Sequence, residues 1–465
     1  MRFLTSRQSV GVAILLIGAA VDLPAQSKAP AQPPVGPFGL SRITTRDGKP
    51  VAIDLFLPNE TCGVCHEREL KELQGSMHSV AHTEGLYRSF AELGRKEAGD
   101  KTYGQCAGCH SASGVVSGLI PAKHDPELPD EAKTGVACDV CHQIEALTGT
   151  KGPWGEPGNA SFVIEAGRVK FGDSGEVAEN RLHTGEKREF FKSAEFCASC
   201  HTVIHPVNGL RIETTYEEWK SSVYAKNGIQ CQDCHMRTVE DALKVAQTLR
   251  PVVVKGQRVL DGAVREIHPH FFVGGNANAD LLGGGVAHAK MAEARLKSAA
   301  RIDLKTPAKA IAGKEFALDV VVQNVAAGHN LPTGVTELRR MWVELQIKDH
   351  SGKLLYRVGD LDERGDLRPG AIWFGAVAVD SAGKTTIRPW EMAKLSRKQS
   401  IAPRESARFT IKTKLPDGVS GPITVESKLL YQSAPQSAVR EVMGKAAITL
   451  KIVEMGRARA VVSVE

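Results

Sequence analysis

The sequence has no cysteine outside one repeated pattern, and beyond its N-terminal segment it has no apolar run long enough to cross a bilayer. The first absence leaves no thiol over for other sites, and the second excludes a membrane span after that segment. The formal net charge of the 465 residues is only +6, so we infer no binding to nucleic acid or to a membrane surface from it.

All ten cysteines fall in five copies of Cys-x-x-Cys-His. The copies read Cys62-Gly-Val-Cys65-His66, Cys106-Ala-Gly-Cys109-His110, Cys138-Asp-Val-Cys141-His142, Cys197-Ala-Ser-Cys200-His201 and Cys231-Gln-Asp-Cys234-His235. This pattern is the c-type haem attachment signal, in which two thiols across one short turn bind the haem covalently and the next histidine reaches the iron. The sequence therefore predicts five covalent haem c groups, each with its motif histidine as the proximal iron ligand.

Two other readings of the cysteines compete with haem attachment. Paired Cys-x-x-Cys units form tetrahedral zinc sites, and in an oxidising compartment ten cysteines can form five short disulfides. Neither explains a histidine directly after every second cysteine. An odd number of units also cannot pair off into four-cysteine zinc sites, so haem attachment is favoured.

The N-terminus predicts export. Arg2 and Arg7 precede an apolar run over residues 10–21, and small residues follow near Ala25, as in a secretory signal peptide over residues 1–25. An uncleaved N-terminal anchor is the alternative. Residues 26–39 are rich in proline, alanine and glutamine and predict a flexible linker. The expected location is periplasmic or extracellular, with no membrane span after signal cleavage.

The length and the motif positions predict an α+β chain of more than one domain. Residues 40–250 hold all five motifs and predict a mostly helical, loop-rich pentahaem cytochrome c domain, with helices expected over 67–90 and 216–226. Loops rich in glycine and proline, such as 149–159, separate the helices. Residues 251–300 form a ligand-bearing segment that ends in a connecting helix over 279–300.

Residues 301–465 contain no cysteine and predict a β domain. Residues 315–325 alternate apolar and polar side chains, and the turn at 349–352 joins two strands in a hairpin. Strands are expected over 315–325, 342–347, 353–358, 371–379, 407–413, 423–431 and 447–453. About seven short strands at this spacing predict an immunoglobulin-like β-sandwich.

Ten histidines remain after the five proximal ones, which is enough to give every haem a second axial ligand. Bis-histidine ligation is therefore expected, and it favours electron transfer over substrate binding. They are His78, His82, His124, His183, His205, His268, His270, His288, His329 and His350. From these we select five distal candidates: His78, His82, His183, His270 and His329.

Each selection depends on local sequence and has an alternative. His78 and His82 lie four apart on an expected helix, so they share one face, and His82 could instead bind a haem propionate. The proline before His270 makes that segment extended, so of His268 and His270 only one is expected to point at an iron. His329 lies in a loop between two strands that could reach the haem domain or be an ordinary loop.

Resemblance adds to this reading. The run at 59–66, followed by Gln74-Gly75-Ser76-Met77-His78, resembles the opening of the cytochrome c-554 family, in which an early haem motif precedes a helix bearing Ser-x-His. Residues 270–276 and 328–334 are similar to motifs of larger members that add a β-sandwich. The resemblance implies haem pairs stacked in a wire and distal roles for His78, His270 and His329.

The chain also departs from that family. Its members have four haems, whereas this sequence has five motifs and a β domain, so a family partner cannot be carried over. Where a second Ser-x-His is expected the sequence has Ser222-Val223-Tyr224. Tyr224 is interpreted as a packed helix aromatic, the alternative being that one haem lacks a histidine there.

Two functions remain open from the sequence. One is electron transfer between redox partner proteins, a donor and an acceptor that the sequence does not identify. The other is an oxidoreductase with one open haem, acting on a small nitrogen or sulfur compound. The absence of Cys-x-x-Cys-Lys, the usual active-site motif of pentahaem nitrite reductases, weighs against the second. Assembly into a larger complex or filament stays open.

Overall fold

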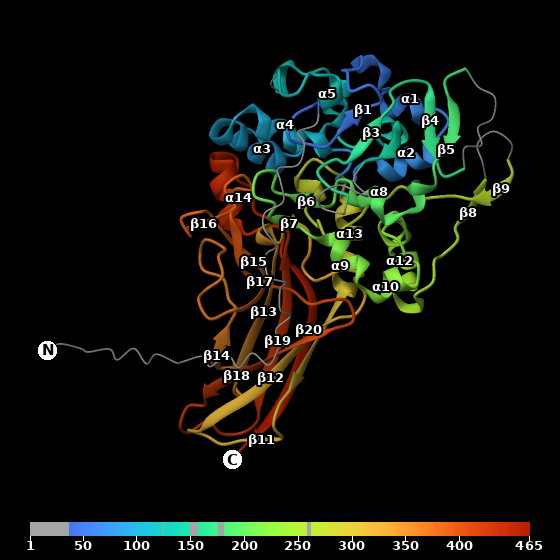
Figure 1. The fold of residues 1–465 in the computed structure, drawn as a ribbon. Helices are drawn as coiled ribbons and strands as arrows, with labels where there is room; N and C mark the ends of the chain where they lie inside the picture. The colour runs from blue at the N-terminus through green and yellow to red at the C-terminus, as the bar shows by residue number, and fades with distance from the viewer. Residues whose placement is uncertain (1–36, 124, 149–156, 175–180, 258–261) are drawn as a thin grey trace.

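The structure, a computed structural model, describes residues 37–123, 125–148, 157–174, 181–257 and 262–465. The predicted signal peptide, most of the predicted linker, most of the loop at 149–159 and His124 lie outside these residues. The helices gather at one end of the molecule, and long strands extend away from them toward the C-terminus (Figure 1). Within the described ranges, no helix is long and apolar enough to cross a membrane.

The end that carries the five motifs is built from short elements. Its helices are α1 (Asn59–Gly63), α2 (Glu67–Leu73), α3 (Gly85–Ala98), α4 (Asp100–His110), α5 (Ala112–Val116), α6 (Asp130–Lys133), α7 (Cys138–His142), α8 (Ala194–Ala198), α9 (Thr215–Lys220), α10 (Val223–Lys226), α11 (Gln232–His235), α12 (Val239–Thr248) and α13 (Val286–Ala299). Its strands are β1 (Thr44–Thr45), β2 (Ile144–Leu147), β3 (Phe162–Ile164), β4 (Val169–Gly172), β5 (Thr184–Lys187), β6 (Val203–Ile204), β7 (Arg211–Glu213), β8 (Lys255–Gln257) and β9 (Val264–Glu266). Most of these helices and strands are too short to be stable alone, so tertiary contacts must hold them in their folded conformation.

The helix expected over 67–90 is two helices. Gly75 has a positive φ of 84°, which ends the first helix because an L side chain is strained there. The chain then passes through turns, and α3 begins where the Glu84 carboxylate accepts hydrogen bonds from the backbone N–H groups of Leu86 and Tyr87. His78 and His82 therefore lie on a turn segment, not on one helix face.

Two further expected helices are also interrupted. The stretch 216–226 divides into α9 and α10 because the Ser222 side chain caps the second helix by accepting from the N–H of Tyr224. The stretch 279–300 contains a short 3-10 helix, Ala279–Leu281, then three glycines and α13. Ala300 already belongs to the first strand of the β half.

The β half consists of two sheets that share one core. One has the order β10-β12-β18, formed by Ala300–Lys305, Glu315–Asn324 and Ser406–Lys414. The other has the order β11-β20-β19-β13-β15-β16, formed by Lys309–Ala310, Val453–Val464, Ile423–Gln432, Arg340–Lys348, Ile372–Val379 and Thr385–Thr386, with β14 (Leu354–Val358) on β13 and β17 (Lys394–Gln399) on β15. The mixed α+β class is confirmed, while an immunoglobulin-like type stays a prediction.

Alternation of apolar and polar side chains gives these strands one buried face. Phe316, Leu318, Val320 and Val322 of β12 are buried against residues of β13 and β19 in the shared core. The expected hairpin is confirmed, since β13 and β14 pair antiparallel across the turn at 349–352. The strand expected over 447–453 is wrong, because β20 begins only at Val453 and runs to Val464.

A short helix and an ion pair join the two halves. Helix α14 (Gln436–Met443) packs beside α3, with Leu86 and Met443 in one apolar cluster. The Arg388 guanidinium lies 2.8 Å from the Glu97 carboxylate. The motif end and the β half are therefore in direct contact.

The β half should depend strongly on Trp342. This side chain is fully buried in β13, and its indole N–H donates to the Gly359 carbonyl at 3.0 Å. We predict that Trp342→Ala lowers the free energy of unfolding by about 3–5 kcal/mol, measured by urea unfolding, because it leaves a cavity and an unpaired carbonyl. Val461→Ala, at a residue that is 63% exposed, should change it by less than about 0.5 kcal/mol. Equal effects would contradict this account of the core.

Candidate haem-binding sites

Each motif forms one helical turn. Motifs two and three lie inside α4 and α7, and in the other three the histidine N–H donates to the carbonyl of the first cysteine at 2.9 Å. Residues four apart in such a turn lie on the same side. Every motif therefore presents its first thiol and its histidine toward one region, as covalent attachment and proximal ligation require.

Four of the five motif histidines face a second imidazole ring. The ring centroids are 6.4 Å apart for His66 and His183, 6.0 Å for His201 and His78, 6.2 Å for His142 and His270, and 6.0 Å for His235 and His329. Two imidazoles that bind opposite sides of one metal at about 2 Å each place their ring centroids about 6 Å apart. These separations fit two axial ligands of one iron.

The second ring nitrogen fixes the orientation of four of these eight rings and of His110. The Nδ1 atom of His142 lies 2.7 Å from the Phe171 carbonyl oxygen, and that of His235 lies 2.7 Å from the Val273 carbonyl oxygen. The same contact links His110 with Ala81, His270 with His268 and His329 with Asn330. A carbonyl only accepts, so Nδ1 carries the proton and Nε2 keeps the lone pair that binds a metal.

Three other histidines use Nε2 within the protein. The Nε2 atom of His288 lies 2.9 Å from the Glu72 carbonyl oxygen, and that of His268 lies 2.7 Å from the Asp173 carboxylate. His205 contacts the Trp390 carbonyl with Nε2 at 3.4 Å. His350 lies on an exposed turn. In His288, His268 and His205 the Nε2 atom is therefore engaged by a contact within the protein.

The second motif has different surroundings. The Tyr87 ring stacks on the His110 ring at 3.9 Å with an interplanar angle of 3°, and His82, also buried, has its centroid 5.9 Å from Tyr87. Among the described residues, no second imidazole faces His110 in the way that the other four pairs do. The expected role of His82 as a distal ligand stays a prediction, and His124 lies outside the described residues.

Burial keeps four of these imidazoles neutral. It lowers the pKa of His78 and His235 to about 3 and that of His110 and His270 to about 4. A neutral imidazole is the form that binds a metal.

Burial raises the pKa of several thiols, and none of the ten is in a disulfide. Burial raises the pKa of Cys106 to about 11 and those of Cys141 and Cys234 to about 12. All ten cysteines are free. Zinc binds thiolates, and no cluster of three or more His, Cys, Asp or Glu side chains able to hold a metal ion occurs in the described ranges. The arrangement therefore fits haem attachment better than zinc units or short disulfides.

Thiols from different motifs lie side by side. Cys62 lies near Cys138 and Cys231 near Cys197, and these interactions raise the pKa of Cys138 and Cys197. The Cys109 sulfur lies 4.0 Å from the Cys200 carbonyl oxygen. Cys141 also interacts electrostatically with Cys200, so the five motifs form one contiguous group.

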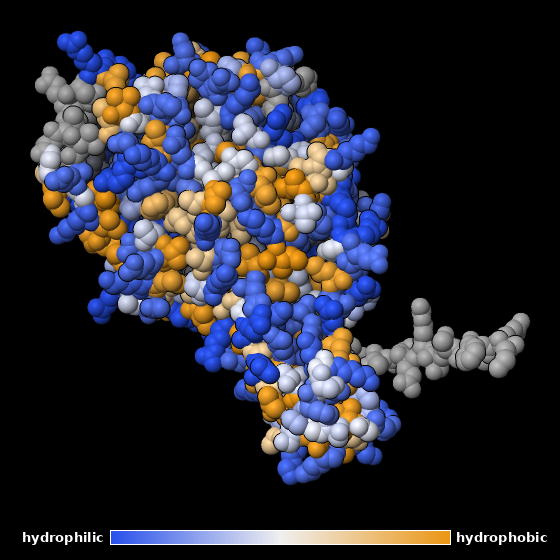
Figure 2. Space-filling model, turned by 180° about the vertical axis from the view of Figure 1, so that it is seen from behind, coloured by the Kyte–Doolittle hydropathy of each residue, from blue (hydrophilic) through white to orange (hydrophobic). Residues whose placement is uncertain are grey.

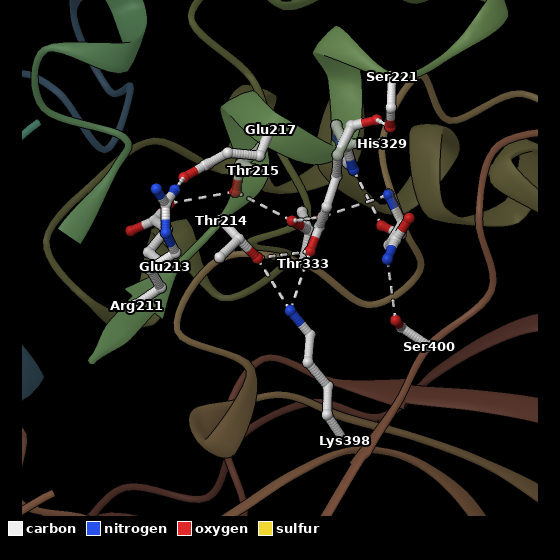
Figure 3. Close-up of polar contacts among 12 residues, drawn as sticks. Arg211, Glu213, Thr214, Thr215, Glu217, Ser221, His329, Thr333, Lys398 and Ser400 are labelled. Carbon is white, nitrogen blue, oxygen red and sulfur yellow. Dashed lines mark hydrogen bonds and ion pairs between the residues drawn. The ribbon is translucent and has the colours of Figure 1, made fainter. Parts of the chain in front are cut away.

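A polar network attaches the His329 loop to α9 (Figure 3). Glu218 accepts hydrogen bonds from the Thr333 hydroxyl at 2.6 Å and from the Lys398 ammonium at 3.1 Å. The amide of Asn324 donates to the His329 carbonyl at 2.8 Å, and that of Asn330 to the Ser400 hydroxyl at 3.0 Å. The β half thus holds His329 against the motif end.

Tyr224 is a packed aromatic, as interpreted from the sequence. It is 1% exposed and clusters with Ile229, Val245 and Ala246, and the Arg404 guanidinium lies 5.4 Å from its ring. The His235 ring faces His329, with ring centroids 6.0 Å apart. Sequence reasoning did not find Tyr87 or Glu213 beside motif histidines, because no spacing rule connects them to a motif.

Comparison with known proteins supports a multihaem c-type cytochrome. Residues 61–143 match the sequence family described as "Cytochrome c554 and c-prime". The fold is similar to the crystal structure of a penta-heme cytochrome c552 from Thermochromatium tepidum, with a TM-score of 0.60 and 18% identity over 88% of this chain and 99% of that chain. No curated protein matches the sequence.

Other solved structures match only parts of the chain. A CARDB domain from Pyrococcus furiosus has 13% identity over 36% of this chain and 87% of that chain, with a TM-score of 0.17. A putative superoxide reductase from Thermotoga maritima has 13% identity over 37% of this chain and 90% of that chain, also with a TM-score of 0.17. Neither carries an argument about this protein.

Some apolar side chains are exposed on the surface of the wide end. Figure 2 shows hydrophobic residues at several places on the wide end of the molecule. Val64, inside the first motif, is 82% exposed, and Val207 is 63% exposed. Side chains of this kind beside the motifs suit contact with an apolar porphyrin face.

Stability should fall with rising pH near neutrality because of one buried carboxyl group. Glu337 is 6% exposed, and burial raises its pKa to about 7. Between about pH 4.5 and 7 the folded state keeps a proton that the unfolded chain has released, so stability falls as pH rises through this window. We predict that Glu337→Gln stabilises the protein at pH 8 by up to about 3 kcal/mol and has little effect at pH 4, measured by urea unfolding. Glu363→Gln, at an exposed loop residue, serves as the control, and an equal gain at both pH values would contradict the assignment.

Proposed function

We propose that the protein transfers electrons through five covalently bound haem c groups, four of them held between two histidines. The observation that carries this proposal is the set of four imidazole pairs at 6.0–6.4 Å, each with one motif histidine. When bound, each haem iron takes up and releases one electron. His183, His78, His270 and His329 serve as the distal ligands of motifs one, four, three and five, and fill the position that a substrate would need.

The motif contacts suggest an order for the five sites. Cys62 contacts Cys138, so the first site adjoins the third. Cys141 and Cys200 interact electrostatically, so the third adjoins the fourth. Cys109 approaches Cys200, and Cys197 contacts Cys231, so the fourth also adjoins the second and the fifth. The fourth site is the junction, and adjacency of this kind permits electron exchange along the chain of sites.

A periplasmic or extracellular location and redox partner proteins fit this role. The N-terminal sequence supports export, and c-type haems act outside the cytoplasm. The donor and acceptor are not defined by the chain, and a complex or filament would use the same sites.

One observation favours a second candidate function. His110 has its Nδ1 bonded to Ala81 and its ring stacked on Tyr87, with no facing imidazole among the described residues. An iron bound there without a second protein ligand would be open to a small nitrogen or sulfur compound. The protein would then be an oxidoreductase whose other sites supply or remove electrons. Adding nitrite, hydroxylamine or cyanide to the oxidised holoprotein tests this, because only an open iron changes its absorption spectrum.

The purified holoprotein should contain five covalent haems. We predict a haem-to-protein ratio of five and an intact mass raised by five haems over the processed chain, measured by pyridine haemochrome assay and mass spectrometry. Replacing Cys231 and Cys234 with serine together should lower both values by one haem, since only the last attachment signal is removed. Bound zinc in place of haem would contradict the proposal.

The variant His329→Ala should convert one haem from low spin to high spin. It removes the imidazole that faces His235, so one iron loses its sixth ligand and becomes accessible to cyanide. The matched control is His350→Ala, which removes a histidine at an exposed turn of the same half. An unchanged spin state in His329→Ala at full haem content would show that His329 is not an axial ligand.

A further inference from the structure

The proximal histidine of the fourth motif has a different neighbour from the others. The Nδ1 atom of His201 lies 3.7 Å from a carboxylate oxygen of Glu213. The Nδ1 atoms of His110, His142 and His235 face uncharged backbone carbonyls at 2.7 Å. The fourth site therefore has a carboxylate beside the Nδ1 atom of its motif histidine, where at least three other sites have an uncharged carbonyl group.

A hairpin brings this carboxylate to His201. The strands β6 and β7 follow the fourth motif directly, and they pair antiparallel with Val203 opposite Glu213. Strand β7 therefore ends at Glu213 beside the stretch that leads from His201 into β6. The local backbone thus accounts for the contact.

Side chains from both halves hold the Glu213 carboxylate in place. The Glu213 side chain is only 12% exposed, and it accepts a hydrogen bond from the Thr215 hydroxyl at 3.3 Å. Thr215 in turn contacts the Thr333 hydroxyl of the His329 loop at 2.9 Å. Figure 3 shows Glu213, Thr215 and Thr333 in the one network that joins α9 to the β half. A charge fixed in this way acts at a constant distance from the imidazole.

The Glu213 carboxylate lies close enough to act on charge at the imidazole, with one oxygen 3.7 Å from the Nδ1 atom of His201. Its negative charge stabilises positive charge on the ring. The same field favours the more positive, oxidised state of a metal bound to the Nε2 atom of that ring.

We propose that Glu213 is a positioning residue that lowers the reduction potential of the iron bound through His201 below those of the sites whose proximal histidines face carbonyls. This inference rests on the proposed function, because it requires a haem at the fourth motif. The fourth site is also the junction that adjoins the second, third and fifth sites. A lowered potential there places electrons preferentially on the surrounding sites and makes the junction the step that controls exchange between them.

The test is a spectroelectrochemical redox titration of the full holoprotein and its variants, fitted with five one-electron components. In Glu213→Gln the side chain keeps its shape and loses its charge. The reduction potential of one component should therefore rise by about 59 mV, which corresponds to a tenfold change in the equilibrium constant for one electron. The other four components should move much less. Glu213→Asp keeps the charge and should restore most of the original potential.

The control is Glu217→Gln, which removes a nearby carboxylate on α9 that is paired with Arg211. It should leave all five potentials close to those of the unmodified protein. The number of haems bound by each variant distinguishes a failure of the proposed function from a failure of the role assigned to Glu213. Fewer than five haems in the unmodified protein would refute the proposed function. Five haems with no shifted component in Glu213→Gln, or the same shift in Glu217→Gln, would overturn only the role of Glu213.

Discussion

Facing pairs of imidazole rings about 6 Å apart are the constraint on which the motif end depends. The proximal ring of each pair comes from a local helical turn, whereas the distal ring comes from a segment remote in sequence, such as His329 opposite His235. A metal held between two such rings is a cross-link between distant parts of the chain. Helices of four to seven residues can therefore be ordered there although they are too short to be stable alone.

In the proposed sites the β half contributes a distal ligand and is not a separate appendage. Its loop supplies His329, and Asn324 holds that loop by donating to the His329 carbonyl. Thr333 of the same loop reaches Glu218 and Thr215 on the motif side, next to the Glu213 carboxylate that faces His201. One interface thus positions a distal imidazole of one site and the charge beside the proximal imidazole of another.

How much could be predicted from the sequence follows from how local each feature is. The five Cys-x-x-Cys-His turns and the hairpin at 349–352 depend on neighbouring residues, and spacing alone reveals them. The helix expected over 67–90 fails because of the backbone at Gly75, and β20 was missed because its polar side chains hide the alternation. Which histidine faces which motif depends on tertiary packing, and so does the contact of Glu213 with His201, so neither could be predicted from periodicity.

The most direct test of the paired imidazoles is electron paramagnetic resonance of the oxidised holoprotein, because spin state reports whether an iron has two strong axial ligands. The account predicts at least four low-spin haems with bis-histidine signals, whatever the ligation of the second motif. Two or more high-spin irons in the unmodified protein would contradict it, because the four ring pairs would then not bind metal as their separations indicate.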